Sequence, residues 1–266
     1  MRRSAGPGSF VSLAPRRARP VVPKVPREAP AGTLAVGVCR CVHGQIDPLA
    51  RASTRGRSLP SRSVDELARH WDDVHSTTAD DEVSWFRAEP TSSLRLLEAW
   101  APERRALVDV GAGSSPLVDR LLLAGWRDVT VLDVSQAALD KVRRRRSGHD
   151  DAVTYLCADA GSWRPRRTFA TWHDRAVFHF LVEPDRRAHY VEAASNAIPA
   201  GGVVVLATFA PDGPNRCSGL PTSRYDADEL ATCFASSFDL VHTEREEHVT
   251  PFGTIQPFTW AVLRHR

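Results

Sequence analysis

The segment Val108-Asp109-Val110-Gly111-Ala112-Gly113-Ser114-Ser115-Pro116 decides the fold of this 266-residue chain. Its apolar start predicts a buried strand. Its Gly-x-Gly predicts a sharp turn into a helix, because glycine tolerates positive φ and lets a ligand lie against bare backbone. Helical spacing of apolar residues follows over residues 117–126. A second apolar run, Val129-Thr130-Val131-Leu132-Asp133, ends in a carboxylate twenty residues after Gly113. This spacing is typical of an acid that accepts hydrogen bonds from a ribose diol.

Pro116 stands where a dinucleotide-binding loop would have its third glycine. That glycine allows close packing of helix and strand while the helix N-terminus faces a pyrophosphate. Proline has no N–H to donate, but it suits the first helical position after a Ser115 cap. The loop therefore fits a nucleoside ligand without a diphosphate, such as S-adenosylmethionine (SAM). An ordinary strand-turn-helix with incidental glycines is the alternative, which the spacing to Asp133 weakens.

Later segments of the chain supply the remaining strands in order: residues 153–160, 169–181, 198–208, 238–246 and 256–263. Together with the first two strands they resemble the class I SAM-dependent methyltransferases over about residues 63–266. The resemblance implies a three-layer, Rossmann-like α/β fold with a mostly parallel seven-stranded sheet and an antiparallel C-terminal strand. The motifs His70-Trp71-Asp72-Asp73-Val74-His75 and Glu82-Val83-Ser84-Trp85-Phe86 resemble the amino-terminal helix and lid of a subgroup that includes thiopurine methyltransferase-like and small lysine methyltransferase-like proteins.

The resemblance assigns a set of residues to the cofactor, SAM. Asp133 is expected to contact the ribose, and Asp159 corresponds to an acid that commonly contacts the adenine amino group in that family. Trp71 and Trp85 are expected to cover the cofactor, since aromatic rings lie well against a sulfonium. Packing of a helix onto the sheet is an equal alternative for Trp85. The full expected set is Trp71, Trp85, Asp109, Gly111, Ala112, Gly113, Asp133, Val134, Asp159, Ala160 and His173.

The residues just after the fourth strand are the expected catalytic group, because in that family they lie over the methyl donor. Asp174 is expected to act as an acid near the sulfonium and the acceptor. Arg175 would anchor an anionic substrate or lid residues, and His179 is a possible base. Alternation along the strand sends His173 and Asp174 to opposite faces, so a packing role for one of them is the alternative. The turn-rich loop over residues 211–221 is expected to shape the acceptor pocket.

These features predict a SAM-dependent methyltransferase that acts on an unidentified acceptor. A small-molecule thiol, hydroxyl or amine and a protein lysine all remain open as acceptors. A nucleotide-dependent Rossmann oxidoreductase is one alternative, which Pro116 disfavours. A protein that binds SAM without catalysis is the other.

Residues 1–62 differ in composition from the rest of the chain. They hold twelve basic and two acidic residues, a net charge of +10, and eight of the nineteen prolines. Such a segment cannot bury enough apolar surface to offset its chain entropy. The remaining 204 residues carry 23 basic and 30 acidic side chains, a net charge of −7. We therefore expect a basic tail over residues 1–62 that is disordered or results from a wrongly placed start site, and a catalytic domain over residues 63–266. The segment is rich in arginine like a transit peptide, but its prolines disfavour the amphipathic helix that such peptides form.

Composition also limits the expected partners. The basic run over residues 143–146 is expected to end a helix and complement its dipole, which disfavours nucleic-acid binding. Five cysteines show no disulfide framework, and Cys39-x-Cys41-x-His43 is a half-site, so no metal is expected. No apolar run approaches the ~18 to 20 residues that span a bilayer. The expectation is a cytoplasmic monomer that acts without nucleic acid or membrane.

Overall fold

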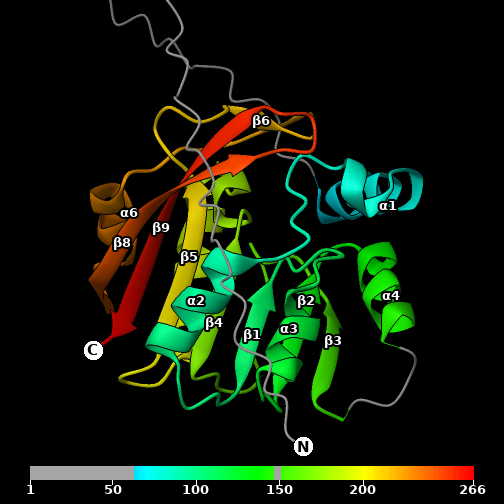
Figure 1. The fold of residues 1–266 in the computed structure, drawn as a ribbon. Coiled ribbons are helices and arrows are strands. Elements are labelled where there is room, and N and C mark those ends of the chain that lie inside the picture. The colour runs from blue at the N-terminus through cyan, green and yellow to red at the C-terminus, as the bar shows by residue number, and fades with distance from the viewer. Residues whose placement is uncertain (1–62, 147–150) are drawn as a thin grey trace, which may run out of the picture. The chain divides into compact units, whose positions relative to one another are not determined.

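Seven strands form one sheet in the spatial order β3-β2-β1-β4-β5-β9-β8 (Figure 1). The computed structural model describes residues 63–146 and 151–266. The expected tail over residues 1–62, its boundary and the Cys39-x-Cys41-x-His43 motif lie outside or at the edge of this part. The strands are β1 (Leu107–Val110), β2 (Val129–Asp133), β3 (Val153–Cys157), β4 (Thr171–Arg175), β5 (Val203–Phe209), β8 (Phe238–Val249) and β9 (Ile255–His265).

Strands β1 to β5 pair in parallel, and β9 runs antiparallel to both β5 and β8. Every residue of β1, β2 and β5 is buried, as expected for parallel strands that are covered on both faces. The predicted fold class is confirmed, including the antiparallel strand near the C-terminus. The parallel arrangement brings the carboxyl ends of β1 to β5 to one edge of the sheet.

Helices cover both faces of the sheet. On one face, α2 (Thr91–Trp100), α3 (Leu117–Leu123) and α4 (Gln136–Arg145) pack their apolar residues against the strands. On the other face lie α5 (Pro184–Ala197) and α6 (Ala227–Phe234). The result is the expected three-layer arrangement.

The remaining elements gather at the carboxyl edge of the sheet. Helix α1 (Val64–Thr77) lies beside α4 at that edge (Figure 1). The short helices are η1 (Asp80–Glu82) and η2 (Phe178–Phe180), and a small hairpin of β6 (Arg216–Cys217) and β7 (Leu220–Pro221) lies within the loop after β5. Among the described residues no helix is both long and apolar enough to cross a membrane.

Several boundaries differ slightly from the sequence expectation. Helix α3 begins at Leu117, so Pro116 occupies the cap position and not the first helical position. Ser115 therefore lies one residue before the cap position, where its Oγ accepts from the Leu117 N–H at 3.2 Å. Helix α3 ends at Leu123 and not near residue 126, because Gly125 follows with a φ of +100°. A left-handed glycine ends helices readily.

The basic run ends α4, as expected, but it also has a structural role. Arg145 donates to the carbonyl oxygens of Ser114 and Ser115 at 2.9 and 2.8 Å and pairs with Asp119. Arg146 pairs with the same carboxylate. These arginines therefore fix the loop between β1 and α3.

Candidate functional site

A cavity of about 480 Å³ lies at the carboxyl edge of the sheet, within the size range of small-molecule sites. The β2–β3 half, as we call it, is lined by Leu132, Asp133, Val134, Ala158, Asp159 and Ala160. The β5–β9 half is lined by His179, Phe180, Phe209, Cys217, Leu220, Pro221, Gln256 and Phe258. The glycine loop and residues 175–177 lie between the two halves. The cavity therefore extends over both sides of the central strands β1 and β4. The rest of its lining consists of Leu67, Trp71, His75, Trp85, Leu181, Val182, Glu183, Pro184 and Arg186.

The glycine loop after β1 is fixed by close contact with the turn after β4. Gly111 and Gly113 have φ angles of +65° and +56°, where a side chain is strained. A Cβ on Gly111 would lie 1.8 Å from Cγ2 of Val177, whereas one on Gly113 would meet Cε1 of His75 at an ordinary 3.5 Å. Gly111 is therefore required for packing as well as for the turn. Ala112, between them, is 9% exposed and packs into the core.

Asp133 places a buried carboxylate at the end of β2. One oxygen accepts from the Gly113 N–H and the other from the Ser135 N–H, both at 2.8 Å. Burial, aided by the charges of Asp109 and Asp72, raises the pKa of Asp133 to about 6, although the two backbone N–H groups oppose the shift. Each carboxylate oxygen has a second lone pair that can accept a hydroxyl donor. The side chain therefore fits a vicinal diol in the adjoining cavity.

Asp159 lies two residues beyond β3 and lines the same half of the cavity with Val134 and Ala160. Its Oδ2 accepts from the Ser162 hydroxyl at 2.8 Å, and its Oδ1 is paired with Arg186. These neighbours fix the carboxylate at the cavity wall. The remaining lone pairs leave it able to accept from a further N–H donor.

Aromatic rings from α1 and the segment after η1 close the cavity. The rings of Trp71 and Trp85 meet edge to face with centroids 5.7 Å apart, and Trp71 meets Phe180 in the same way at 5.4 Å. His75 lies 6.2 Å from Trp85, against the glycine loop. Burial and the charge of Lys141 lower the pKa of His75, so the ring is neutral near pH 7. Trp71 and Trp85 therefore line the cavity as well as packing together.

Two acids that the sequence analysis did not select hold this aromatic cover in place. Asp72 on α1 accepts from the Ser135 hydroxyl at 2.7 Å and from the Ala137 N–H at 2.9 Å, and so caps α4 from another helix. Asp80 on η1 pairs with Lys141 and accepts from the Ser114 hydroxyl, each at 2.8 Å. Charge and N-cap patterns within one segment do not reveal such contacts between distant segments.

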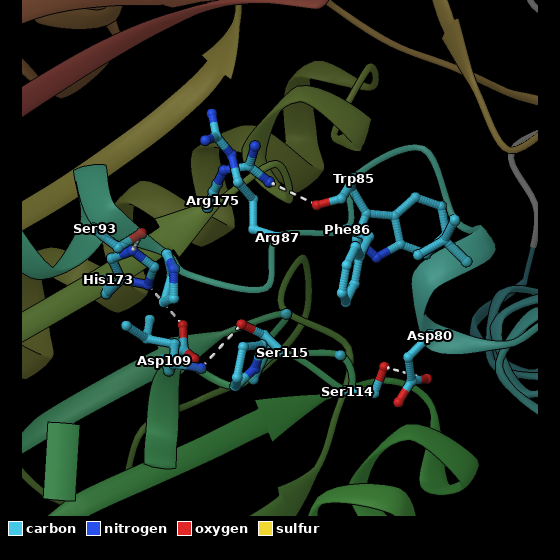
Figure 2. Close-up of a pocket in the computed structure, with 17 residues that line it drawn as sticks. Asp80, Trp85, Phe86, Arg87, Ser93, Asp109, Ser114, Ser115, His173 and Arg175 are labelled. Atoms are coloured by element: carbon cyan, nitrogen blue, oxygen red, sulfur yellow. Dashed lines mark hydrogen bonds and ion pairs between the residues drawn. The ribbon is translucent and has the colours of Figure 1, made fainter. Parts of the chain in front are cut away.

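His173 and Asp109 are neighbours in the register of β4 and β1. Nδ1 of His173 lies 2.7 Å from the Asp109 carboxylate, and its Nε2 lies 3.0 Å from the Ser93 hydroxyl. Figure 2 shows these three side chains in a row beside a second, smaller cavity of about 80 Å³. All three are at least 97% buried. His173 and Asp109 therefore form a bonded pair behind the glycine loop and do not line the large cavity.

Asp174 lies on the opposite face of β4 from His173, as strand alternation predicts. Its carboxylate accepts from the Tyr190 hydroxyl, from the Val177 N–H at 2.8 Å and from the Phe178 N–H at 3.1 Å. It is fully buried and lines neither cavity. Burial raises its pKa to about 6, although these donors oppose the shift. The hydrogen bonds of Asp174 therefore direct its carboxylate toward Tyr190 on α5 and to the turn after β4.

Arg175 lies between the two cavities and lines both. Its Nη1 donates to the Trp85 carbonyl at 3.3 Å, shown in Figure 2, and its guanidinium lies 4.7 Å over the Phe258 ring. Its Nη2 is 3.6 Å from Glu246 and is buried with no hydrogen-bond partner among the described residues. Burial lowers the pKa of Arg175, but a guanidinium stays charged in proteins. Arg175 therefore brings a fixed positive charge to the wall of the β5–β9 half.

His179 is fully buried in η2 and stacks on Phe209 at 4.4 Å. Burial and the charge of Arg175 lower its pKa to about 3. Nδ1 accepts from the Phe209 N–H at 3.3 Å, so the neutral ring carries its proton on Nε2. Nε2 has no partner among the described residues. The His179 ring is therefore neutral near pH 7 and has an N–H donor without a partner at Nε2.

The sequence analysis missed the aromatic and amide residues that complete the β5–β9 half. Phe258 and Gln256 come from β9, far along the chain, and Phe180 comes from η2. The only indication of their role in the sequence was that the predicted strands place them near the carboxyl edge of the sheet. The loop over residues 211–221, expected to shape the acceptor pocket, contributes Cys217, Leu220 and Pro221 to the lining. Among the described residues no group of three or more His, Cys, Asp or Glu side chains could hold a metal ion.

Comparison with known proteins relates this arrangement to methyl transfer. Residues 107–202 match the model of a family described as "Methyltransferase domain". No curated protein matches the chain significantly in sequence.

Several solved structures share the fold. A SAM-dependent methyltransferase from Anabaena variabilis has 17% identity and a TM-score of 0.60, and the match covers 78% of this chain and 97% of that one. The 1,6-didemethyltoxoflavin-N1-methyltransferase of Burkholderia thailandensis has 20% identity and a TM-score of 0.61, over 78% of this chain and 92% of that one. The N-methyltransferase NodS of Bradyrhizobium japonicum has 13% identity and a TM-score of 0.56, over 76% and 97%. The chain thus carries a methyltransferase-domain match over residues 107–202 on the fold of the SAM-dependent methyltransferases.

Proposed function

We propose that this protein is a SAM-dependent methyltransferase, with its cofactor in the β2–β3 half of the cavity and its acceptor in the β5–β9 half. The observation that carries the proposal is the single continuous cavity that joins Asp133 and the glycine loop to a separate aromatic compartment. When bound, SAM would supply an electrophilic methyl group on its sulfonium sulfur. The family match and the solved structures that share the fold support this cofactor.

The residues of the β2–β3 half fit SAM in their chemistry. Asp133 has lone pairs for a ribose diol, and Asp159 has them for an amino group. Asp133 and Asp159 are the charged side chains of this half, and Arg186, which also lines the cavity, is already paired with Asp159. A diphosphate would be repelled by these acids, and Pro116 has no N–H that could bind it. The β2–β3 half therefore disfavours a dinucleotide. The oxidoreductase alternative is disfavoured for this reason.

The aromatic residues around the β5–β9 half would exclude water and hold the acceptor. Trp71, Trp85 and Phe180 meet edge to face and give a rigid wall, and Phe209 and Phe258 continue it. Alignment of donor and acceptor is the main requirement of such a transfer, because preorganisation can contribute about 7 to 11 kcal/mol. A second compartment for an acceptor favours a catalyst over a protein that only binds SAM.

The three residues expected to act in catalysis take different roles in this proposal. Arg175 contacts the acceptor, and His179 offers it an N–H donor. Asp174 is a positioning residue, because its carboxylate holds the Val177 and Phe178 N–H groups of the turn that separates the two halves. No charged base lies in the β5–β9 lining. The proposal therefore favours an acceptor that is nucleophilic without deprotonation by this protein.

We further propose that the protein belongs to the thiopurine methyltransferase-like or small lysine methyltransferase-like subgroup. In this proposal it is a cytoplasmic monomer without nucleic-acid or membrane partners. Solved structures of similar fold include enzymes described as acting on 1,6-didemethyltoxoflavin and on a glycopeptide. We propose a small-molecule acceptor of this general kind and retain a protein lysine as the alternative.

The proposal is tested by thermal unfolding with added ligands, followed by turnover. S-adenosylhomocysteine (SAH), the demethylated product of SAM, should raise the melting temperature, and NAD at the same concentration should not. A metabolite extract incubated with methyl-labelled SAM should then yield a labelled product. Stabilisation by NAD alone would support the oxidoreductase instead. Stabilisation by SAH without any labelled product from small-molecule or protein extracts would support the non-catalytic alternative.

A further inference from the structure

None of the eight residues that line the β5–β9 half carries a charge at pH 7, and Arg175 brings a positive charge to its boundary. The same cavity also has Glu183 in its lining, next to Pro184 at the start of α5. The lining of the β5–β9 half consists of aromatic and aliphatic groups, the neutral ring of His179, the Gln256 amide and the Cys217 thiol. Burial raises the pKa of Cys217, so the thiol is neutral near pH 7. Arg175, at the boundary with the β2–β3 half, supplies the charge. An acceptor held by these eight residues therefore lies next to the Arg175 guanidinium, and none of the eight is a carboxylate.

The charge of Arg175 is only partly balanced by its neighbours. Glu246 is the carboxylate nearest to it, and that group is shared with Arg87, which it approaches more closely. The other Glu246 oxygen accepts from the Trp260 indole N–H at 2.8 Å. On the side of the small cavity, Asp109 is bonded to His173. Two guanidinium groups thus share one carboxylate, and buried charges are costly unless paired.

Two donors at this wall are incompletely satisfied. Nε2 of His179 is buried without a hydrogen-bond partner among the described residues. Nη2 of Arg175 is also buried, and its nearest acceptor is the Glu246 carboxylate in the 3.6 Å ion pair, beyond hydrogen-bond distance. Their residues lie near each other, since the Arg175 charge acts on the His179 ring and both side chains contact Phe258. A buried donor without an acceptor costs about 1 to 3 kcal/mol. A ligand oxygen would remove this cost on binding.

We infer that the methyl acceptor carries an anionic oxygen, most simply a carboxylate, on an apolar or aromatic body, and that Arg175 and His179 recognise this oxygen. The inference rests on the proposed function and names the substrate class. The rings of Phe180, Phe209 and Phe258 would hold the apolar body, while the two donors fix its charged end. The same chemistry could also come from the methionine carboxylate of the cofactor, so the test separates the two sources.

The first arm of the test measures cofactor binding alone. SAH, which has a carboxylate, and 5′-methylthioadenosine, which lacks it, are titrated by calorimetry into wild-type protein and Arg175→Met. We expect Arg175→Met to change the affinity for both ligands by less than about threefold. A selective loss for SAH would assign the guanidinium to the cofactor carboxylate and overturn the inference. Failure of wild-type protein to bind SAH would contradict the proposed function instead. The second arm of the test would then be run without SAH.

The second arm uses matched acceptor probes in protein saturated with SAH. The pairs are phenylacetate with phenylacetamide and indole-3-acetate with indole-3-acetamide. Wild-type protein should prefer the carboxylate of each pair by about tenfold or more, as expected for a hydrogen bond to a charged group. Arg175→Met should remove most of the preference. Equal binding of acid and amide by wild-type protein, or no binding of either, would overturn the inference.

Two further variants separate charge from hydrogen bonding. Glu246→Gln keeps an acceptor for Trp260 but removes the counter-charge, so the preference for carboxylate should increase. His179→Phe should weaken the acid more than the amide, because an N–H bonds more strongly to an ionised oxygen than to an amide oxygen, and the part of the preference that Arg175 confers should remain. Arg245→Met, which removes an exposed arginine paired with Asp212, is the control and should change nothing. If the Glu246→Gln variant keeps the wild-type melting temperature but shows no increased preference for the carboxylate probes, the proposed effect of the counter-charge is contradicted.

Discussion

The two halves of the cavity are built in different ways. In the β2–β3 half, the polar groups are fixed by neighbours in the same motifs, as when Asp133 accepts from the Gly113 and Ser135 N–H groups. In the β5–β9 half, side chains arrive from β4, η2, β5 and β9, and Arg175 and His179 keep unpartnered donors. Local motifs therefore define the half proposed for the cofactor, and the same cofactor half can serve enzymes with different acceptors. Long-range packing defines the half that selects the acceptor.

The largest effect, on the free energy of unfolding, is expected where the glycine loop contacts the turn after β4. Gly111→Ala should lower the free energy of unfolding by about 2 to 5 kcal/mol, because positive φ costs ~1 to 2 kcal/mol and overpacking a core adds ~1 to 3 kcal/mol. The new Cβ would lie 1.8 Å from Val177. Urea unfolding measures the loss.

Two variants test the cause of that loss. Gly201→Ala has a similar positive φ of +81° but no atom within 4 Å of its Cβ, so only the backbone strain should appear. Adding Val177→Ala to Gly111→Ala should restore part of the stability. Equal losses in the two single glycine variants would show that steric contact with the turn after β4 is unimportant.

Asp174 should matter for stability more than for cofactor binding. Asp174→Ala leaves three buried donors without an acceptor, and at ~1 to 3 kcal/mol each the loss should be about 3 kcal/mol or more. SAH affinity should change less than threefold, provided that the titration is done well below the melting temperature. Asp140→Ala, an exposed acid on α4, is the control. A stable Asp174→Ala variant with abolished turnover would return this residue to direct catalysis.

SAH binding should weaken at low pH because Asp133 must accept hydroxyl donors. Its pKa of about 6 lies above the ordinary 3.8, so the carboxylate is mostly ionised at pH 7 and mostly protonated at pH 5. The affinity for SAH should fall about tenfold between these values, as one proton must be released on binding. Asp133→Asn should show weak affinity with no such dependence. A wild-type affinity that is constant from pH 5 to pH 7 would contradict the ribose assignment.

The same pKa values have a consequence for folding. The pKa of Asp133 and of Asp174 is raised by burial, so each group's contribution to stability is fully present below pH 3.8. It is lost as the pH rises through about 6.

The smallest effect is expected on the pH dependence of turnover when His179 is replaced. Its pKa of about 3 leaves the ring neutral throughout the working range. The pH profile of turnover from pH 5 to 8 should therefore keep its shape in His179→Gln, although the rate itself can fall. An inflection near pH 6.5 that disappears in this variant would restore the role of general base.

Local sequence patterns predicted the sheet well. Apolar runs, Gly-x-Gly and the acid at the end of β2 depend on neighbouring residues, and the structure confirms the strands and the antiparallel β9. Alternation along β4 also separated His173 from Asp174 correctly. These predictions succeed because strand periodicity is a property of a few adjacent residues.

The environment of the acceptor half could not be predicted in this way. The direction of the Asp174 carboxylate depends on Tyr190 in α5, and the charge state of His179 depends on burial beneath Phe209. Likewise, Asp72 caps a helix that begins 64 residues later in the chain. Spacing within a motif carries no information about such partners, which only the folded chain brings together.

The most direct test of the account compares SAH affinity in three variants by calorimetric titration at pH 7.5. Asp133→Ala should bind SAH about 10- to 150-fold more weakly than wild type, since a hydrogen bond to a charged group contributes about 1.5 to 3 kcal/mol. Asp140→Ala and Arg175→Met should bind within about threefold of wild type. This result would assign the cofactor to the β2–β3 half. Wild-type affinity in a folded Asp133→Ala variant would contradict that assignment, and with it the division of the cavity into cofactor and acceptor halves.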